Sequence, residues 1–343
     1  KGRRRCPTCG KGIPPALAGR FGQRACIAVH PDSLALRAWD RLERQDTFLR
    51  VLLPTAGAGA RRTLTNEARL LQWALGKPGF AGFVDAGRLR ETGGAYLATE
   101  FIDGVPLGRA LRKSPPAHCI ETFMTALAPV VLLHTQGLVL CNLTADAFLV
   151  TPSGRTYLVG LGQVRPSGAQ GGGTGTPGYR APEQWRPTAE VTAASDVFAL
   201  GVCLYRLLTR RYPYGRPRSG AIFKAGHIPP PPSRYNKYVT AEVDEIVLRA
   251  IARAPEERFA SAQELQAALK TAFGTATAVD ECAYASPSWP RLVTESLTHA
   301  GMMAWQAGAW LAGAVLRQSV GLASAFVDGV CTLTAARRRT VIA

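Results

Sequence analysis

The stretch "GTGTPGYRAPEQW", residues 173–185, decides how this chain is expected to fold. A long run at 195–214, "SDVFALGVCLYRLLTRRYPY", follows it. This run is apolar on nearly every face and begins at Ser195, a residue type that commonly caps helices, so we expect a buried helix. Further along, after a helical pattern at 243–252, lies "PEERFASAQEL" at 255–265. These three segments, in this order, are the most specific signal in the sequence.

The half of the chain before residue 173 has a different pattern. Short apolar runs at 47–54 and 93–104 are typical of strands, and the spacing at 65–75 predicts a helix capped by Thr65. A buried helix is expected at 119–137, bent at Pro129. Because strands come first and helices later, the order predicts an α+β fold with two lobes and argues against a parallel βαβ sheet.

Composition limits the classes of function. The chain has 343 residues, 47% of them hydrophobic, which is enough for a large core. Its net charge of +17 comes from 41 basic and 24 acidic residues, so an anionic partner has to be considered. The basic residues are nevertheless spread along the chain, with short clusters only at 3–5 and 337–339. No nucleic-acid recognition module is visible, so nucleic-acid binding is not expected.

The cysteines indicate a reducing compartment. Eight cysteines in 343 residues are too few for a dense disulfide framework. Cys119, Cys141 and Cys203 lie in apolar runs, where a thiol acts as a small hydrophobic group. The basic N-terminal segment has no apolar core like that of a cleavable signal peptide. We therefore expect a cytoplasmic protein.

The three segments of the second half resemble the large lobe of bacterial Hanks-type Ser/Thr protein kinases. "GTPGYRAPEQW" is similar to the end of that family's activation segment, 195–214 to its large buried helix, and 255–265 to its closing segment. The resemblance covers about residues 24–273 and implies a two-lobed protein-kinase-like fold.

The resemblance also implies architectural roles for particular residues. Glu183 would pair with Arg258 and lock the activation segment to the helical lobe. Asp196 would accept hydrogen bonds from the backbone of the catalytic loop. Arg50 stands where the family has a strand lysine, and we expect it to form a structural bridge to Glu67.

The positions that the family uses for chemistry differ. Phosphoryl transfer relies on a carboxylate near the acceptor hydroxyl and on oxygen ligands for magnesium. Asn142 occupies the position of the carboxylate, and the ligand positions fall on Ala147 and Gly160. The neighbouring Asp146 is expected to project away from the metal position. The sequence therefore predicts that the catalytic base and both magnesium ligands are missing.

The nucleotide side is also altered. The family's three loop glycines, which let the backbone approach phosphate closely, fall on Ala28, His30 and Ser33. We therefore expect no nucleotide cofactor.

A metal site is conceivable at the N-terminus. Cys6 and Cys9 form a CxxC knuckle, which supplies two of the four ligands of a structural zinc site. Cys26 and His30 would complete the set, although the resemblance places both in the first strand and the loop after it. Ligands before Lys1 and a pair of free thiols are alternatives.

The last part of the chain lies outside the resemblance. Its helical pattern has one narrow polar stripe and a wide apolar face, which predicts burial in a membrane interface or against partner helices. Packing on the protein's own lobe is the alternative. The expected domains are a cysteine-containing arm (1–22), the kinase-like domain (23–273), a linker (274–290) and this helical tail (291–343). Membrane or partner contacts are expected from Trp305, Trp310, Leu311, Leu316, Leu322 and Phe326.

Two functions follow from these observations. The first is a catalytically inactive pseudokinase that serves as a scaffold or protein-binding module and is held at the cytoplasmic face of a membrane, or in a membrane-protein assembly, by its tail. The alternative is a kinase-fold transferase with non-standard nucleotide chemistry. A carboxylate able to hold a metal in the cleft would distinguish the second from the first.

Overall fold

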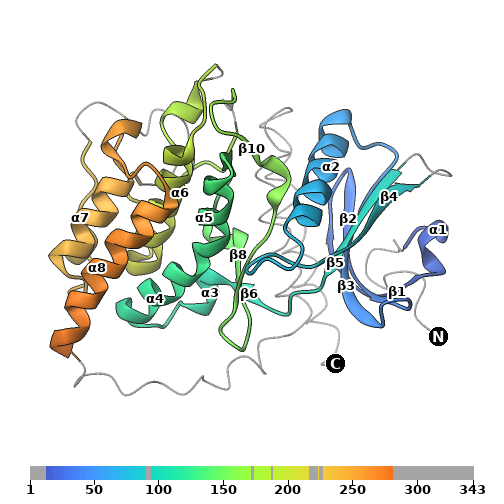
Figure 1. Ribbon diagram of the computed structural model, residues 1–343, viewed down its shortest axis with the longest axis horizontal. Coiled ribbons are helices and arrows are strands. Elements are labelled where there is room, and N and C mark those ends of the chain that lie inside the picture. Colours follow the sequence, from blue (N-terminus) through green and yellow to red (C-terminus); the bar gives the residue numbers. More distant parts are fainter. Residues whose placement is uncertain are drawn as a thin grey trace, which may run out of the picture.

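The computed structural model describes residues 13–280, apart from gaps at 90–93, 171–173, 187, 216–222 and 224–226. Two lobes lie side by side, a sheet-rich N-lobe and a helical C-lobe (Figure 1). This arrangement agrees with the predicted two-lobed α+β fold. The predictions for Cys6, Cys9 and the whole helical tail fall outside the described residues.

The N-lobe is a five-stranded antiparallel sheet with the strand order β1-β2-β3-β5-β4. Alternate side chains of β1–β3 and β5 point to one face, where they form an apolar cluster around Leu36, Leu49 and Ala98, all fully buried. The strands are β1 (Phe21–Val29), β2 (Ser33–Asp40), β3 (Gln45–Leu52), β4 (Phe83–Leu89) and β5 (Gly94–Glu100).

One long helix, α2 (Ala58–Trp73), packs beside this sheet (Figure 1). It begins seven residues before the predicted cap, because Gly57 in extended conformation is the N-cap. Thr65 is therefore inside the helix, where its hydroxyl donates to the carbonyl of Arg61 at 2.9 Å. A threonine can make this bond within a helix as readily as it can cap one, which is why the prediction of the helix start was wrong.

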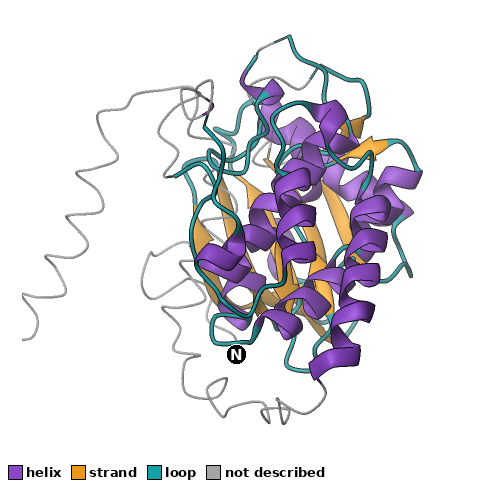
Figure 2. Cartoon of the chain, turned by 90° about the vertical axis from the view of Figure 1, so that its left-hand side faces the viewer, coloured by secondary structure: helices purple, strands orange, loops and turns teal. Residues whose placement is uncertain are grey.

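The C-lobe is mainly helical, and its helices pack together beside short strands (Figure 2). The strands form two small sheets, one in the order β6-β8-β9 and one pairing β7 with β10. The helices are α3 (Leu107–Ala110), α4 (Pro116–Ala126), α5 (Ala128–Thr135), α6 (Ala193–Thr209), α7 (Ala241–Ala250) and α8 (Ala262–Asp280). The strands are β6 (Val105–Pro106), β7 (Leu138–Val139), β8 (Phe148–Val150), β9 (Thr156–Leu158) and β10 (Arg165–Pro166).

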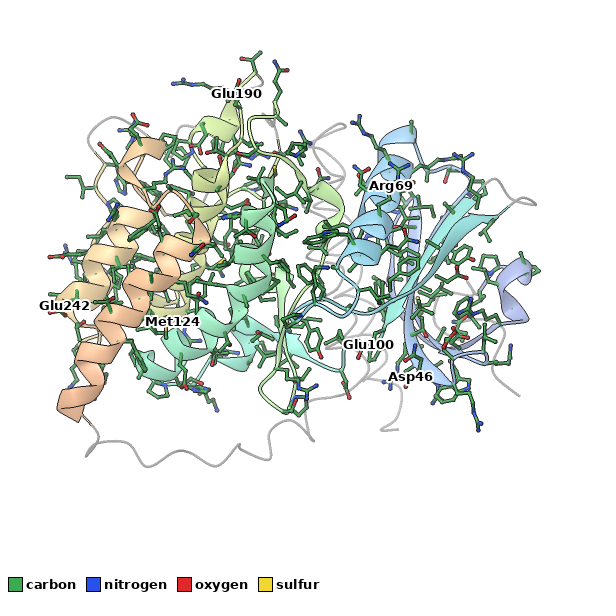
Figure 3. All side chains as sticks on the ribbon, in the orientation of Figure 1. Asp46, Arg69, Glu100, Met124, Glu190 and Glu242 are labelled. Carbon is green, nitrogen blue, oxygen red and sulfur yellow. The ribbon has the colours of Figure 1, made fainter. Side chains whose placement is uncertain are left out.

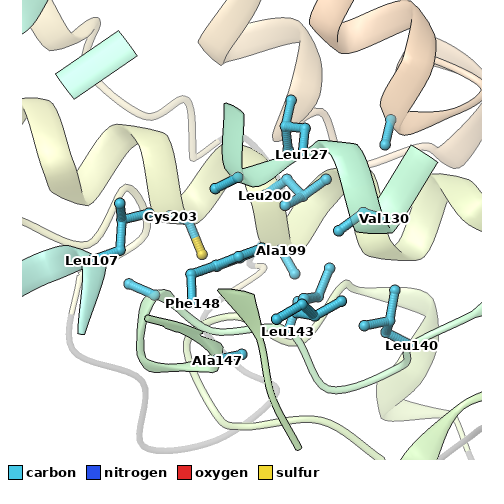
Figure 4. Packing of buried hydrophobic residues seen from close by; sticks show 14 of the residues in the cluster. Leu107, Leu127, Val130, Leu140, Leu143, Ala147, Phe148, Ala199, Leu200 and Cys203 are labelled. Carbon is cyan, nitrogen blue, oxygen red and sulfur yellow. The ribbon is translucent and has the colours of Figure 1, made fainter. Parts of the chain in front are cut away.

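Helix α6 runs through the core of the C-lobe, as its apolar sequence predicts. Leu200 and Cys203 are fully buried and lie close to Phe148 and Leu127 (Figure 4). The helix starts earlier than predicted, because Thr192 is its N-cap and Ser195 completes a capping box from the third helical position.

The apolar run at 119–137 forms two helices, α4 and α5, which break at Leu127 just before Pro129. Proline lacks the N–H that a continuous helix needs, so the predicted bend occurs as a break. Within the described residues, Pro116–Thr135 is the one stretch long and apolar enough to cross a membrane. More than half of its most apolar part is buried inside the protein. Its apolar character is accounted for by the C-lobe core.

Asp196 at the start of α6 organises the loop after β7. Its carboxylate accepts hydrogen bonds from the backbone N–H groups of Leu140, at 2.6 Å, and Cys141, at 2.9 Å. His134 lies 3.1 Å from the same carboxylate through Nε2, while its Nδ1 accepts from the backbone N–H of Ala262. Because Nδ1 is an acceptor, the proton of this buried imidazole is on Nε2 and points at Asp196. The loop contacts expected of Asp196 are present, and His134 adds a link to α8.

Glu183 and Arg258 form a two-pronged ion pair across the C-lobe. The guanidinium donates to Oε1 at 2.8 Å and to Oε2 at 2.9 Å, and Arg258 is fully buried at its side chain. Its other N–H groups donate to the carbonyls of Ala252, Ala194 and Arg253. The pair therefore fastens the segment after residue 173 to α6 and to the loop before α8.

Both ends of the kinase-like region extend past the predicted boundaries. A short helix, α1 (Pro15–Ala18), lies within the range predicted as a cysteine-containing arm, and Leu17 is buried in the N-lobe core. At the other end α8 continues to Asp280, into the range predicted as a linker. The glycine and alanine composition that indicated a linker is thus compatible with a helix attached to the lobe.

Substituting Arg258 tests the importance of the ion pair. Arg258→Ala leaves the carboxylate of Glu183 without its partner, and the free energy of unfolding should fall by about 3–5 kcal/mol. Urea denaturation followed by circular dichroism measures this change, with the exposed Arg69→Ala as the control. A loss no larger than that of the control would mean that the pair does not hold the lobe together.

The same loss should depend on pH. Burial opposes ionisation of Glu183, but its bonds with Arg258 outweigh burial and lower the pKa of this carboxyl. A lowered pKa in the folded state contributes stability above the unfolded pKa of about 4.3, and this contribution is lost as the pH falls below it. The difference between the parent and Arg258→Ala should therefore shrink in acid.

Candidate functional site

A hollow between the two lobes is the candidate site, and the N-lobe sheet forms its roof. Phe48 and Arg50 face it from β3, Glu67 from α2, Leu149 from β8 and Gly160 from the loop after β9. Figure 3 shows Glu100, which also lines the hollow, where the chain passes from one lobe to the other. Most of the lining is apolar, and Arg50 and Glu67 are its most deeply buried charges.

Arg50 and Glu67 form the ion pair that the sequence predicts. Nη1 of Arg50 lies 2.6 Å from Oε2 of Glu67, and the two side chains are only 4% and 9% exposed. Burial lowers the pKa of Arg50 to about 10 despite the opposing effect of Glu67, so the guanidinium stays charged at neutral pH. The other carboxylate oxygen of Glu67 accepts from the backbone N–H of Leu161 at 3.3 Å. The pair therefore connects β3, α2 and a C-lobe loop.

The turn between β1 and β2 differs from a phosphate-binding loop. The backbone N–H of His30 donates to Ser33 at 2.8 Å, so this amide already has a partner. The negative charge of Asp32, in the same turn, opposes the lowering of the pKa of both His30 and Arg50, and for Arg50 it is the smallest of the causes. Burial is the main cause that lowers the pKa of His30, and nearby Arg50 lowers it further, so the imidazole is neutral at pH 7. The carboxylate of Asp32 repels anions, and the backbone N–H of His30 already donates to the Ser33 carbonyl. Both features of this turn disfavour phosphate binding.

Aromatic side chains form part of the wall of the hollow, which is lined by Phe48 and Phe101. Phe48 lies on the same face of β3 as Arg50, because alternate residues of a strand share a face. Its ring packs, together with Phe101, against a small buried cluster from β1 and β2, formed by Ile27, Ala28 and Ala35. The wall next to Arg50 is therefore bulky and apolar.

The loop positions of the C-lobe provide a neutral set of groups. Asn142 accepts a hydrogen bond from the hydroxyl of Thr176 at 2.8 Å through its side-chain oxygen. Ala147 and Gly160 have no side-chain oxygen, and Gly160 adopts a left-handed conformation (φ +78°). Magnesium prefers oxygen ligands, and a general base needs a group that accepts a proton. The residues at these positions do not fit a magnesium-bound nucleotide.

Asp146 lies in the short 3-10 turn Ala145–Ala147, between the catalytic-loop position Asn142 and β8. It is not among the residues that line the hollow. Its negative charge adds to burial, which is the main cause, in raising the pKa values of Tyr179 and Cys203. The expectation that its carboxylate projects away from the metal position stays a prediction.

The described residues contain no group of three or more His, Cys, Asp or Glu side chains that is suited to a metal ion. Cys26 is buried within the N-lobe core, and His30 lies in the turn above Arg50. These two predicted zinc ligands thus belong to different surroundings. Cys6 and Cys9 lie outside the described residues.

The segment after residue 173 is held by its own hydrogen bonds. The amide of Gln184 donates to the carbonyl of Cys141 at 2.9 Å, and Arg180 donates to the carbonyl of Gly175 at 2.7 Å. The guanidinium of Arg180 also stacks on the ring of Trp185, 4.4 Å from its centroid. These contacts are architectural. They account for the particular residues found in this segment by their role in the fold.

Sequence reasoning missed Phe48, which lines the hollow. It precedes Arg50 by two residues, and the alternation of a strand would have placed its ring on the face of the site.

Comparison with known proteins gives a consistent result. The family model described as "Protein kinase domain" matches residues 80–269, more than half of the chain. Serine/threonine-protein kinase Pkn1 of Myxococcus xanthus is 33% identical over 190 residues, 52% of this chain and 27% of that protein. Serine/threonine-protein kinase PknB of Mycobacterium leprae is 28% identical over 275 residues, 75% of this chain and 43% of that protein. The chain thus spans less than half the length of these two relatives.

Solved structures share the fold. The PknI kinase domain of Mycobacterium tuberculosis has a TM-score of 0.56 and 22% identity, covering 73% of this chain and 95% of that one. The kinase PK-1 of the Cydia pomonella granulovirus has a TM-score of 0.61 and 16% identity, covering 73% and 94%. The family model begins at residue 80 and so leaves out β1–β3 and α2, the part that holds the altered turn, Phe48 and Arg50.

A double substitution tests whether the pair of Arg50 and Glu67 is structural. Arg50→Met leaves a buried carboxylate uncompensated and should cost about 3–5 kcal/mol of unfolding free energy. Replacing both charges, in Arg50→Met with Glu67→Leu, should restore a large part of that loss, since buried pairs exchange for apolar groups at little cost. Urea denaturation of the parent and three variants, including Glu67→Leu alone, measures the coupling. A double variant less stable than Arg50→Met would contradict this account.

Proposed function

The chain belongs to the protein kinase domain family and is similar to bacterial Ser/Thr kinases of the Hanks type, and from this premise we propose that it is a pseudokinase. It would bind other proteins through its kinase-like fold without transferring phosphate. The single observation that carries the proposal is the neutral set of groups at the catalytic-loop and metal positions. Asn142, Ala147 and Gly160 supply neither a base nor a metal ligand.

The energetics of nucleotide binding support this proposal. A bound triphosphate brings several negative charges, which other kinases balance with magnesium and a lysine. Here Arg50 already has Glu67 at 2.6 Å and feels the charge of Asp32. Phosphate entering beside Arg50 would meet the carboxylate of Glu67 without a metal to screen it. The balance of charge therefore favours an empty or differently used cleft.

The binding role is supported by what the fold retains. The Glu183–Arg258 pair, the Asp196 contacts and the bonds of Gln184 maintain a rigid C-lobe surface. A rigid surface lowers the entropy lost when a partner binds, so a fold kept for recognition would retain these contacts after catalysis is lost. A kinase-fold transferase with other nucleotide chemistry is the alternative, and it would require a cation or phosphate site that uses other residues.

We propose in addition that the tail holds this protein at the cytoplasmic face of a membrane or in a membrane-protein assembly. The proposal rests on the sequence of residues 291–343, in which a wide apolar face and a basic end follow one another. Zinc bound through Cys6 and Cys9 remains a separate proposal, and loss of metal on treatment of the purified protein with a chelator is its test.

Magnesium and ATP should not stabilise the protein. A ligand present at one hundred times its dissociation constant adds about 2.7 kcal/mol, which would raise the melting temperature by roughly 5–10 °C. Thermal unfolding with and without magnesium and millimolar ATP measures this effect, with the PknB relative as positive control. A magnesium-dependent rise in melting temperature would contradict the pseudokinase proposal, and a rise that does not need magnesium would favour the alternative transferase.

Removing the tail tests the membrane proposal. A chain ending at Asp280, where α8 ends, should appear in the soluble fraction of cells, while the full chain should sediment with membranes, because the wide apolar face of the predicted tail helix has to be buried. Immunoblotting of the two fractions measures the distribution. If both chains are equally soluble and monomeric, the tail packs on its own domain and the anchoring proposal is wrong.

A further inference from the structure

We propose that one face of the C-lobe, at the end of α6, binds the anionic headgroups of a lipid surface. This face consists of three segments: the end of α6, the loop between α3 and α4, and the chain between residues 228 and 238. The inference concerns the described lobe and depends neither on the absence of catalysis nor on the tail. Its basic side chains are Arg112, Lys113, Arg210, Arg211, Arg234 and Lys237, all exposed.

These segments lie in two ranges of the sequence that contain no acidic residue. Residues 197–241 contain eight arginines and lysines but no aspartate or glutamate. Residues 104–120 contain three arginines and lysines and likewise no acidic residue. Asp103 and Glu121 border the shorter range, and Asp196 and Glu242 border the longer one, with Asp196 buried at the opposite end of α6. The basic residues are spread along the chain, but the acidic residues are not. The net positive charge is therefore concentrated in these segments.

The fold brings the two acid-free segments together. The guanidinium of Arg210 donates to the carbonyls of Leu111 and Arg112, which joins the end of α6 to the α3–α4 loop. Asn236 donates to the carbonyl of Leu208 at 3.0 Å, which fixes the third segment to the same end of α6. Six cations thus gather around one helix end. Figure 1 shows the helices involved, α3, α4 and α6, within the C-lobe.

Aromatic side chains accompany the cations. The guanidinium of Arg211 lies 4.7 Å from the ring centroid of Tyr235, and the ammonium of Lys237 lies 5.2 Å from that of Tyr238. Tyr238 is 61% exposed and Ile228 is 82% exposed. Tyrosine rings with a polar tip are suited to the boundary between headgroups and acyl chains, and exposed apolar groups beside cations are typical of membrane-facing surfaces.

A lipid surface fits this face because such a partner needs only charge and a few inserted side chains. Ile228 and Tyr238 are exposed beside the cations and can supply the inserted groups. Each basic residue near an anionic membrane adds to the attraction, so six cations are ample for reversible binding.

The test is binding of the full chain to vesicles of phosphatidylcholine, with and without phosphatidylglycerol. The variant Arg211→Glu, Arg234→Glu, Lys237→Glu reverses three charges on the face. The matched control reverses three exposed arginines of the N-lobe, Arg62→Glu, Arg69→Glu and Arg88→Glu; Arg69 is labelled on α2 in Figure 3. Co-sedimentation gives the partition coefficient, and circular dichroism checks that each variant is folded. A set with glutamine in place of glutamate serves if the reversed charges prevent folding.

The face-specific variant should lose at least about 10-fold of its partition onto phosphatidylglycerol vesicles, and the control should lose much less. Neither variant should change partition onto neutral vesicles, which reports any contribution of the tail. Equal losses in both variants would show that only net charge matters and would overturn the proposal, as would no loss in either. If the face-specific variant loses binding to duplex DNA but keeps its vesicle binding, the face belongs to nucleic acid and the proposal is wrong.

Discussion

The ion pair between Glu183 and Arg258 is the interaction on which the arrangement of the C-lobe depends. Arg258 is fully buried and has five hydrogen bonds, two of them to Glu183 and the others to backbone carbonyls on either side. A charge in this place is tolerable only when every donor has an acceptor. The segment around Glu183, the start of α6 and the loop before α8 must therefore be in position at the same time. This requirement gives the Ala-Pro-Glu stretch a structural role in this lobe.

A second buried pair has a different consequence in the N-lobe. In kinases the basic residue of β3 is shared between a glutamate and the nucleotide phosphates. Here Arg50 is held by Glu67, and Phe48 lines the same hollow. The ion pair links β3 to α2 and, through Glu67, to Leu161 in the C-lobe. One buried contact thus joins three elements from both lobes.

The sequence was sufficient for the class of fold, the Glu183–Arg258 pair and the contacts of Asp196, because each belongs to a motif of fixed spacing. It was insufficient for the start of α2, where Thr65 bonds within the helix, and for Ser195, which supports a cap instead of forming one. The position of Phe48 on the lining of the hollow was readable from strand alternation. The effect of the Asp32 charge on the pKa of Arg50 depends on how the β1–β2 hairpin folds. The basic face was hidden because its segments are joined only in three dimensions.

The contact between α2 and the loop after β9 shows how little freedom remains in the cleft. A side chain at Gly162 would place its Cβ 2.3 Å from Cγ2 of Thr63 and 3.2 Å from the Thr63 carbonyl, so only glycine allows this approach. Glu67, one turn further along α2, accepts the backbone N–H of Leu161 in the same loop. A helix held both by steric fit and by a buried ion pair has one preferred position. In the described residues, the two lobes are therefore joined by contacts between their own residues.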